Sequence, residues 1–127
     1  MSAAPLSLPR REDQPDGSVK ILFAAPILDI GEPKKSLTLR PPTVAEFWEI
    51  GDPRHFVYSA DGIGTPYTDR PTLLTWIRRL ITGHDADLVG SEGDLALAML
   101  IEGAVLDFFT KARMSLRAAS VTSPIEG

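Results

Sequence analysis

Hydrophobic and polar positions follow the most regular pattern between residues 94 and 113, where apolar side chains recur at the spacing of an α-helix. One face of this predicted helix is a core stripe of Leu97, Ile101, Ala104, Val105, Phe108 and Ala112, with Ala98 and Phe109 at its edge. A second, shorter stripe on a different face holds Leu95, Met99 and Leu106. Burying a large aliphatic side chain contributes about 1.5 to 3 kcal/mol, so the second stripe should be covered. The cover is either another part of this chain or a partner protein.

Two residues on this side of the helix favour the partner interpretation. The thioether of Met99 is flexible and suits an adaptable surface. Gly103 costs about 1 kcal/mol relative to alanine inside a helix, and a close approach by another backbone gives a reason for it. The predicted partner-binding residues are Leu95, Met99, Glu102, Gly103 and Leu106. The same spare stripe predicts a homo-oligomer that forms with increasing concentration.

The N-terminal half predicts a β-hairpin. Residues 19–30 are rich in β-prone side chains, and residues 31–35 combine Gly and Pro in a turn. Residues 36–40 then alternate Leu37 and Leu39 with polar side chains, which gives the second strand one dry face and one wet face. Because an isolated hairpin is marginally stable in water, it should pack on helices.

A short second helix should follow directly. Thr43 and Glu46 have the spacing of a capping box, and Gly51 with Pro53 just beyond it is typical of a helix C-terminus. We expect this helix to turn three apolar side chains inward: Val44, Phe47 and Trp48. The long connection at 52–69 has no helical period, and it allows a small second hairpin at 56–67.

A third helix is predicted from Pro71 to Thr82, capped by Asp69 or Thr68 and closed by Gly83. Its apolar arc consists of Leu73, Leu74, Trp76, Ile77, Leu80 and Ile81. Residues 84–93 form an acidic, glycine-containing link in which Leu88 and Val89 should plug the core. Ser91 and Asp94 have capping spacing before the long helix.

These elements predict one α+β domain at 19–115, with a small N-terminal antiparallel β-hairpin packed on a mainly helical C-terminal part of three helices. Residues 1–18 are rich in proline and poor in large apolar side chains, so we expect a disordered N-terminus. Residues 116–127 have little to pack against and should fray.

The charge balance excludes several classes of partner. There are 13 Lys and Arg against 17 Asp and Glu, and a net charge of -4 argues against binding to nucleic acid or to an anionic membrane surface. The absence of cysteine excludes disulfides and cysteine-ligated zinc. Neither a signal peptide nor an apolar run of membrane-spanning length is evident, so we expect a soluble cytosolic protein.

Candidate metal and nucleotide sites are weak. His84 opens the segment 84–87, which contains two aspartates, and we interpret this segment as an acidic loop that caps helix ends rather than as a metal site. Gly62 and Gly64 lack the third glycine, the following helix and the downstream acid of a dinucleotide fingerprint. They predict a turn, and we expect no metal and no cofactor.

Catalytic and nucleic-acid sites are equally weak. Ser59, His55 and Asp61 are the best candidates for nucleophilic catalysis, but their closeness along one loop is poor evidence because a triad is recognised by geometry. Arg78 and Arg79 fit the solvated face of a helix. We therefore expect neither an enzyme nor a DNA-binding regulator.

The order of short motifs resembles the tail assembly chaperones of Mu-like and related contractile-tailed bacteriophages. The motifs are Pro26-Ile27, Gly31, the run from Leu37 to Thr43, Glu46, the run from Leu80 to Gly83, Asp94 at the start of a helix, and Phe108-Phe109 at its end. The resemblance extends over about residues 20–110.

This resemblance implies a nonenzymatic helper that binds the tape measure protein, keeps it soluble and helps to recruit tail tube subunits. It also implies a location in the host cytoplasm and absence from the mature virion. A structural virion component, such as a tail or connector subunit, is the alternative from a different class. A coat for a helical, aggregation-prone protein needs adaptable apolar surface, and a helix with a spare apolar face provides it.

Overall fold

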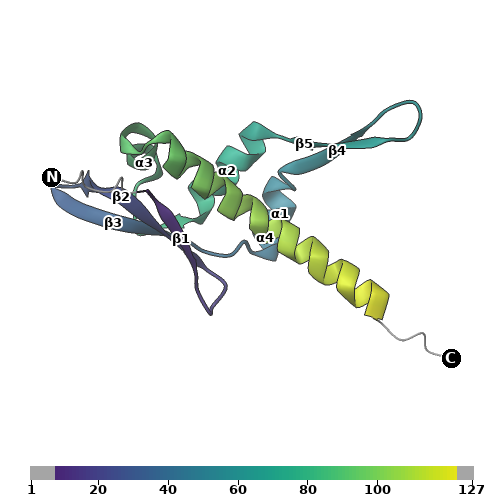
Figure 1. The fold of residues 1–127 in the computed structure, drawn as a ribbon, viewed down its shortest axis with the longest axis horizontal. Coiled ribbons are helices and arrows are strands. Elements are labelled where there is room, and N and C mark those ends of the chain that lie inside the picture. The colour runs from purple at the N-terminus through teal and green to yellow at the C-terminus, as the bar shows by residue number, and fades with distance from the viewer. Residues whose placement is uncertain (1–7, 123–127) are drawn as a thin grey trace, which may run out of the picture.

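The computed structural model describes residues 8–122. Within them the elements are β1 (Arg10–Asp13), β2 (Val19–Asp29), β3 (Glu32–Leu39), α1 (Val44–Ile50), β4 (Arg54–Tyr58), β5 (Gly64–Thr68), α2 (Arg70–Leu80), β6 (Ile81–Thr82), α3 (Ala86–Glu92) and α4 (Leu95–Thr122). The long helix α4 crosses the molecule, and the β4–β5 hairpin projects from the body (Figure 1). The predicted α+β class is confirmed.

The predicted hairpin is the centre of an antiparallel sheet. The strand order of this sheet is β1-β2-β3-β6, and β2 pairs with β3 in the register Val19 to Leu39. The pairing shifts between Leu22 and Ile27, where a bulge interrupts the ladder. The predicted turn at 31–35 is too long, because residues 32–35 already belong to β3 and pair back towards β2. The turn lies at Ile30 and Gly31, and both have positive φ, at 53° and 73°. A glycine suits that conformation, whereas an isoleucine rarely adopts it.

The prediction of disorder is wrong for residues 10–13, which form strand β1 along β2. Two ion pairs tie this strand to α4: Arg11 to Asp107 at 2.5 Å, and Asp13 to Lys111 at 3.4 Å. Backbone pairing with β2 and ion pairs with α4 hold β1 in place. The strand is therefore ordered although it contains few large apolar residues. Residues 1–7, which the same prediction included, lie outside the described residues.

Helix α2 ends at Leu80, two residues earlier than predicted, because the chain joins the sheet. Ile81 and Thr82 pair with β3 as strand β6, and the Thr82 hydroxyl donates a hydrogen bond of 3.0 Å to the carbonyl of Thr38. Gly83 does not close the helix but follows this strand with a φ of 76°. The predicted Asp69 cap is confirmed, since its carboxylate accepts from the backbone N–H of Thr72.

The core lies between the sheet and helices α2 and α4. Its buried side chains are Val19, Ile21, Ile27, Leu37, Leu39, Leu73, Trp76, Leu80, Val89, Leu97, Ile101, Ala104, Val105 and Phe109. Trp76 is fully buried, donates from Nε1 to the carbonyl of Gly51 at 2.7 Å, and meets the ring of Phe109 edge-on at 5.1 Å. The predicted core stripe of α4 is confirmed except at its end, where Phe108 is only partly buried and Ala112 is exposed.

The link at 84–93 is not a loop, because residues 86–92 form α3. Asp85 caps this helix through the backbone N–H groups of Asp87 and Leu88, as the acidic composition predicted. The predicted plug is confirmed, with Val89 buried and Leu88 packed against the core. Asp94 alone caps α4, accepting from the N–H of Leu97 at 2.8 Å.

The predicted fraying from residue 116 is wrong up to residue 122, since α4 continues to Thr122. Residues 123–127 lie outside the described part of the chain. The end of α4 and the β4–β5 hairpin project from the same end of the molecule, and a space separates them (Figure 1). Both therefore offer surface that the core does not use.

Candidate protein-binding surfaces

The second stripe of α4 is mostly uncovered in the structure. Leu95 is 70% exposed and Met99 is 63% exposed, whereas Leu106 is partly buried against the core. Gly103 is exposed, and nothing lies within 4 Å of a Cβ built on it. Glu102 is held by Arg70 of α2 in an ion pair of 3.1 Å. The structure therefore brings the five predicted residues to one side of α4 but gives Leu106 and Glu102 partners within the chain.

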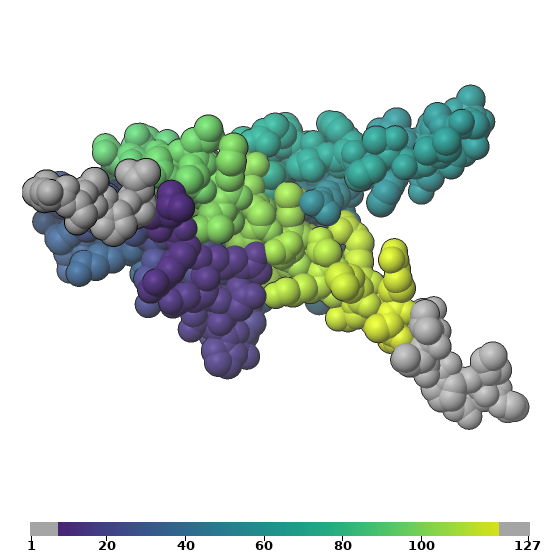
Figure 2. Space-filling view, in the orientation of Figure 1, coloured from purple at the N-terminus to yellow at the C-terminus, as the bar shows by residue number. Residues whose placement is uncertain are grey.

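Helix α4 lies at the surface between the N-terminal strands and the β4–β5 hairpin (Figure 2). Leu95 and Met99 stand one helical turn apart, so they expose a continuous apolar strip. The open space beside Gly103 leaves room for another backbone to approach the helix. We call Leu95, Met99 and Gly103 the α4 strip.

A second apolar surface is a groove of about 360 Å³ between α1 and the C-terminal half of α4. It is lined by Pro42, Thr43, Val44, Phe47, Asp52, Phe108, Phe109, Ala112, Arg113 and Leu116. Phe109 is buried, and its ring centroid lies 6.2 Å from that of Phe47 with the two rings tilted by 36°. Val44 is 63% exposed and Leu116 is 72% exposed. We call this hollow the α1–α4 groove.

The inward orientation predicted for Val44, Phe47 and Trp48 is wrong, because these side chains are 63%, 41% and 80% exposed. The buried residue of α1 is Glu46 instead. A buried carboxylate needs charged and polar partners, and these are Arg40 just after β3, Thr43 at the cap of α1 and Arg79 of α2. Binding to those partners turns Glu46 inward and leaves Val44, Phe47 and Trp48 exposed. The clue in the sequence is Arg40, six residues before Glu46.

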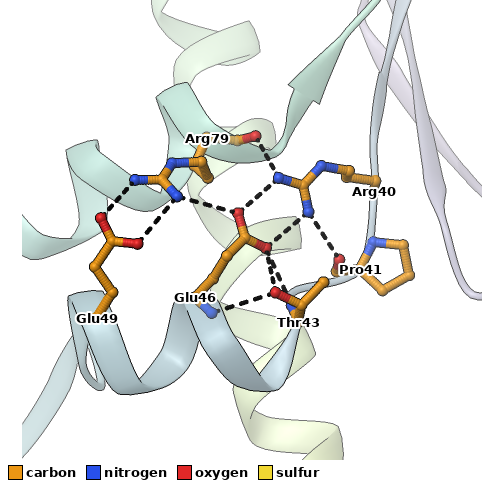
Figure 3. Close-up of polar contacts among 6 residues, drawn as sticks. All are labelled: Arg40, Pro41, Thr43, Glu46, Glu49 and Arg79. Atoms are coloured by element: carbon orange, nitrogen blue, oxygen red, sulfur yellow. Dashed lines mark hydrogen bonds and ion pairs between the residues drawn. The ribbon is translucent and has the colours of Figure 1, made fainter.

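A polar network fixes α1 in this orientation (Figure 3). The Arg40 guanidinium donates to both carboxylate oxygens of Glu46, at 2.7 and 2.6 Å, and to the carbonyl of Arg79 at 3.1 Å. Thr43 and Glu46 form the predicted capping box, with the Glu46 N–H donating to the Thr43 hydroxyl at 3.2 Å. Arg79 approaches Glu46 at 3.6 Å and pairs with Glu49 at 3.1 Å. Helix α1 is therefore fastened to the end of β3 and the end of α2.

The charge of Glu46 is strongly favoured. Hydrogen bonds from Arg40 lower the pKa of Glu46 to about 2, and hydrogen bonds from the backbone and hydroxyl of Thr43 add to the effect. Burial of the carboxylate acts in the opposite direction but is outweighed. Glu46 is thus a structural anion, and one wall of the α1–α4 groove depends on it.

The β4–β5 hairpin is the third exposed apolar surface, and it fulfils the allowed hairpin at 56–67. Its large apolar side chains are all more than half exposed, namely Phe56, Val57, Tyr58, Ile63 and Tyr67. Phe56 and Tyr58 stack with ring centroids 6.4 Å apart on one face. A Cβ at Gly64 would lie 2.8 Å from the Tyr58 ring, so this glycine lets the ring lie across the neighbouring strand.

The residues considered for catalysis are not assembled. The Ser59 hydroxyl donates a hydrogen bond to the Asp61 carboxylate in an exposed turn. Gly62 and Gly64 predicted a turn here, and Gly62 adopts a φ of 86° in it. His55 lies 3.9 Å from Asp69 and beside Tyr67. The structure therefore does not join the serine, histidine and aspartate.

The other histidine is enclosed at the far end of the sheet. The His84 side chain is 0% exposed, its Nδ1 lies 3.8 Å from Asp29, and its Nε2 has no hydrogen-bond partner within the described residues. Its ring meets Phe23 edge-on at 5.4 Å. Residues 8–122 contain no group of three or more His, Cys, Asp or Glu side chains arranged to hold a metal ion. In the same residues, no helix is both long and apolar enough to cross a membrane.

Comparisons with known proteins found no relative. No protein-family model matches the chain, and neither a curated protein nor a solved structure does. The resemblance to tail assembly chaperones rests on the sequence motifs, and its functional meaning is a proposal.

Proposed function

We propose that this protein is a nonenzymatic phage tail assembly chaperone. It binds the tape measure protein, keeps it soluble and helps to recruit tail tube subunits in the host cytoplasm, and it is left out of the mature virion. The observation that carries this proposal is the exposure of large apolar side chains on the α4 strip, at 70% for Leu95 and 63% for Met99.

The surface has the properties that a chaperone for a long helical protein needs. Apolar side chains on a helix can pack against an amphipathic helix of a partner, and a methionine adapts to different side chains. The hairpin and the α1–α4 groove add further apolar surface on other elements. A net charge of -4 opposes self-aggregation of a protein with this much exposed apolar surface.

The sequence motifs behind the resemblance have a structural role that is consistent with the proposal. Arg40, Thr43 and Glu46 belong to the motif run, and together they hold α1 against β3 and α2. They shape one wall of an apolar groove rather than a catalytic centre. Such a role fits a binding protein whose signature residues maintain the shape of its surface.

Co-expression tests the proposal directly. The tape measure protein encoded by the same phage is expressed alone and with this chain, and its soluble fraction and co-purification are measured. We expect the chain to raise the soluble fraction and to co-purify with the tape measure protein. A tape measure protein that stays insoluble and unbound in the presence of folded chain contradicts the proposal.

The alternative is a structural tail or connector subunit. The β4–β5 hairpin favours it, because a projecting pair of strands with open edges can add to a sheet of a neighbouring subunit. Mass spectrometry of purified virions separates these functions. A chaperone is absent from the particles, whereas a structural subunit is present in fixed stoichiometry with other tail proteins.

A further inference from the structure

The charges beside the α1–α4 groove are unevenly distributed. Every charged residue of α4 after Asp107 is basic, namely Lys111, Arg113 and Arg117, although the whole chain carries a net charge of -4. Arg113 lines the groove, and Arg117 follows it one turn later on the same side of the helix. The segment of α4 beside the groove is therefore basic on an otherwise acidic protein.

The acidic residue at this site is already engaged. Asp52 lines the groove and forms an ion pair with Arg113. Arg117 is exposed and follows the lining residue Leu116 directly, so it is the charge next to this end of the groove that Asp52 does not compensate. Arg117 has no ion-pair partner among the described residues, in contrast to Arg113 and Lys111. An incoming carboxylate can therefore pair with Arg117 without displacing an existing contact.

The shape of the groove suits a helix. Two helices, α1 and α4, form its walls, and the rings of Phe47 and Phe109 line it with their centroids 6.2 Å apart. Val44 and Leu116 also line it, with most of their side-chain surface exposed. Trp48, which is 80% exposed, lies one turn after Val44 and extends the apolar wall of α1. An amphipathic helix that lays its apolar face into such a groove covers all of these side chains at once.

We infer that the α1–α4 groove binds an amphipathic helix whose apolar stripe is flanked by acidic side chains. The stripe packs on Phe47, Phe109 and Leu116, and the acidic flank faces Arg117. The inference deepens the proposed function, since it states which kind of partner segment this groove takes.

A synthetic peptide tests this chemistry without the tape measure protein. The probe is a stapled helical peptide with a leucine stripe flanked by glutamates, and its matched control replaces those glutamates with lysines. Binding to the full chain is measured by calorimetry, and the site is located by NMR chemical-shift changes at the Trp48 indole. The second tryptophan, Trp76, is fully buried and serves as an internal reference.

We expect the glutamate peptide to bind and to shift the Trp48 signal, and the lysine peptide to bind several-fold more weakly. Leu116→Ser should lower the affinity for the glutamate peptide about tenfold, because it removes an apolar contact. The control Met114→Ser alters a side chain that is 62% exposed but does not line the groove, and it should leave binding unchanged.

Charge reversal tests the acidic flank. Arg117→Glu should lower the affinity for the glutamate peptide about fivefold and raise the affinity for the lysine peptide, because the charge beside the groove changes from positive to negative. Lys35→Glu makes the same change in net charge on β3, outside the groove, and should affect neither peptide. Circular dichroism spectra of the variants confirm that each remains folded.

Three results overturn the inference. If both peptides bind equally well, the inferred preference for acidic side chains is wrong. If Leu116→Ser leaves binding of the glutamate peptide intact, the peptide does not bind in the α1–α4 groove. If neither peptide binds and Leu116→Ser instead abolishes self-association in sedimentation experiments, the occupant is a second copy of this chain. None of these results bears on co-expression with the tape measure protein, so failure here is distinguishable from failure of the proposed function.

Discussion

Arg40 and Glu46 form a bidentate ion pair, with hydrogen bonds of 2.7 and 2.6 Å, that joins the end of β3 to α1. The Glu46 side chain is 9% exposed, so the pair is shielded from solvent on the side of the carboxylate. Together with the contacts of Thr43 and Arg79, this pair holds α1 in the orientation that leaves Val44 and Trp48 exposed. The apolar surface around α1 thus results from a buried charge.

We predict that Arg40→Lys lowers the free energy of unfolding by about 1 to 3 kcal/mol, because an ammonium group cannot reproduce the paired hydrogen bonds of a guanidinium. Urea denaturation measures this loss. Arg10→Lys is the matched control, since Arg10 is 70% exposed and its pair with Glu12 is 3.5 Å long. The control should change stability by less than about 0.5 kcal/mol. Equal effects of both variants contradict the importance assigned to the Arg40 pair.

The depressed pKa of Glu46 predicts a specific loss of stability in acid. The contribution of this carboxylate is fully present above its ordinary pKa of 4.5 and disappears as the pH falls through its folded value of about 2. It amounts to about 3 kcal/mol near neutral pH. Wild-type protein and Glu46→Gln should therefore differ most above about pH 6, and their stabilities should converge only as the pH falls to about 2. If the free energies of unfolding of the two proteins keep a constant difference over this pH range, Glu46 is not charged in the folded state.

Substitutions on the second stripe of α4 should separate binding from folding. Leu95→Glu and Met99→Glu alter exposed side chains, so each should change the free energy of unfolding by less than about 1 kcal/mol. Each should nevertheless weaken binding of the tape measure protein. Leu106→Glu should destabilise the fold by about 2 kcal/mol or more, because Leu106 packs on the core. Thermal unfolding and co-purification measure the two effects. Strong destabilisation by Met99→Glu contradicts the assignment of Met99 to a free surface.

Loss of structure in the β4–β5 hairpin should leave the stability of the core unchanged. Replacing Phe56 and Tyr58 with serine removes the stacked pair on one face but no buried side chain. We expect faster amide exchange in residues 54–68 and a change of less than about 0.5 kcal/mol in global stability. Gly64→Ala should act in the same direction, since the new methyl group displaces the Tyr58 ring. Cooperative loss of the whole fold in either variant contradicts this independence.

Local patterns predicted the parts of the fold that depend on local physics. The Thr43–Glu46 capping box and the buried positions Leu97, Ile101 and Val105 followed from spacing alone, because caps and helix faces repeat within a few residues. The hairpin around Gly31 followed from its turn residues and the alternation that flanks them.

Contacts between distant segments account for what the sequence did not reveal. β1 is ordered by pairing with β2 and by the contact of Arg11 with Asp107, 96 residues away. The orientation of α1 depends on Arg40 and Arg79, which a helical wheel of α1 does not contain. Of the predicted binding residues, Leu95 and Met99 are free, whereas the positions of α2 and the core decide that Glu102 and Leu106 are not. The α1–α4 groove was missed for the same reason.

Oxidation of Met99 tests most directly whether a partner covers the α4 strip. The chain is treated with dilute peroxide alone and in complex with the tape measure protein, and sulfoxide formation at Met99 is followed by mass spectrometry. Because Met99 is 63% exposed in the free chain, we predict ready oxidation there and a several-fold slower rate in the complex. An oxidation rate at Met99 that is the same in the free chain and in the complex would contradict a binding role for the α4 strip.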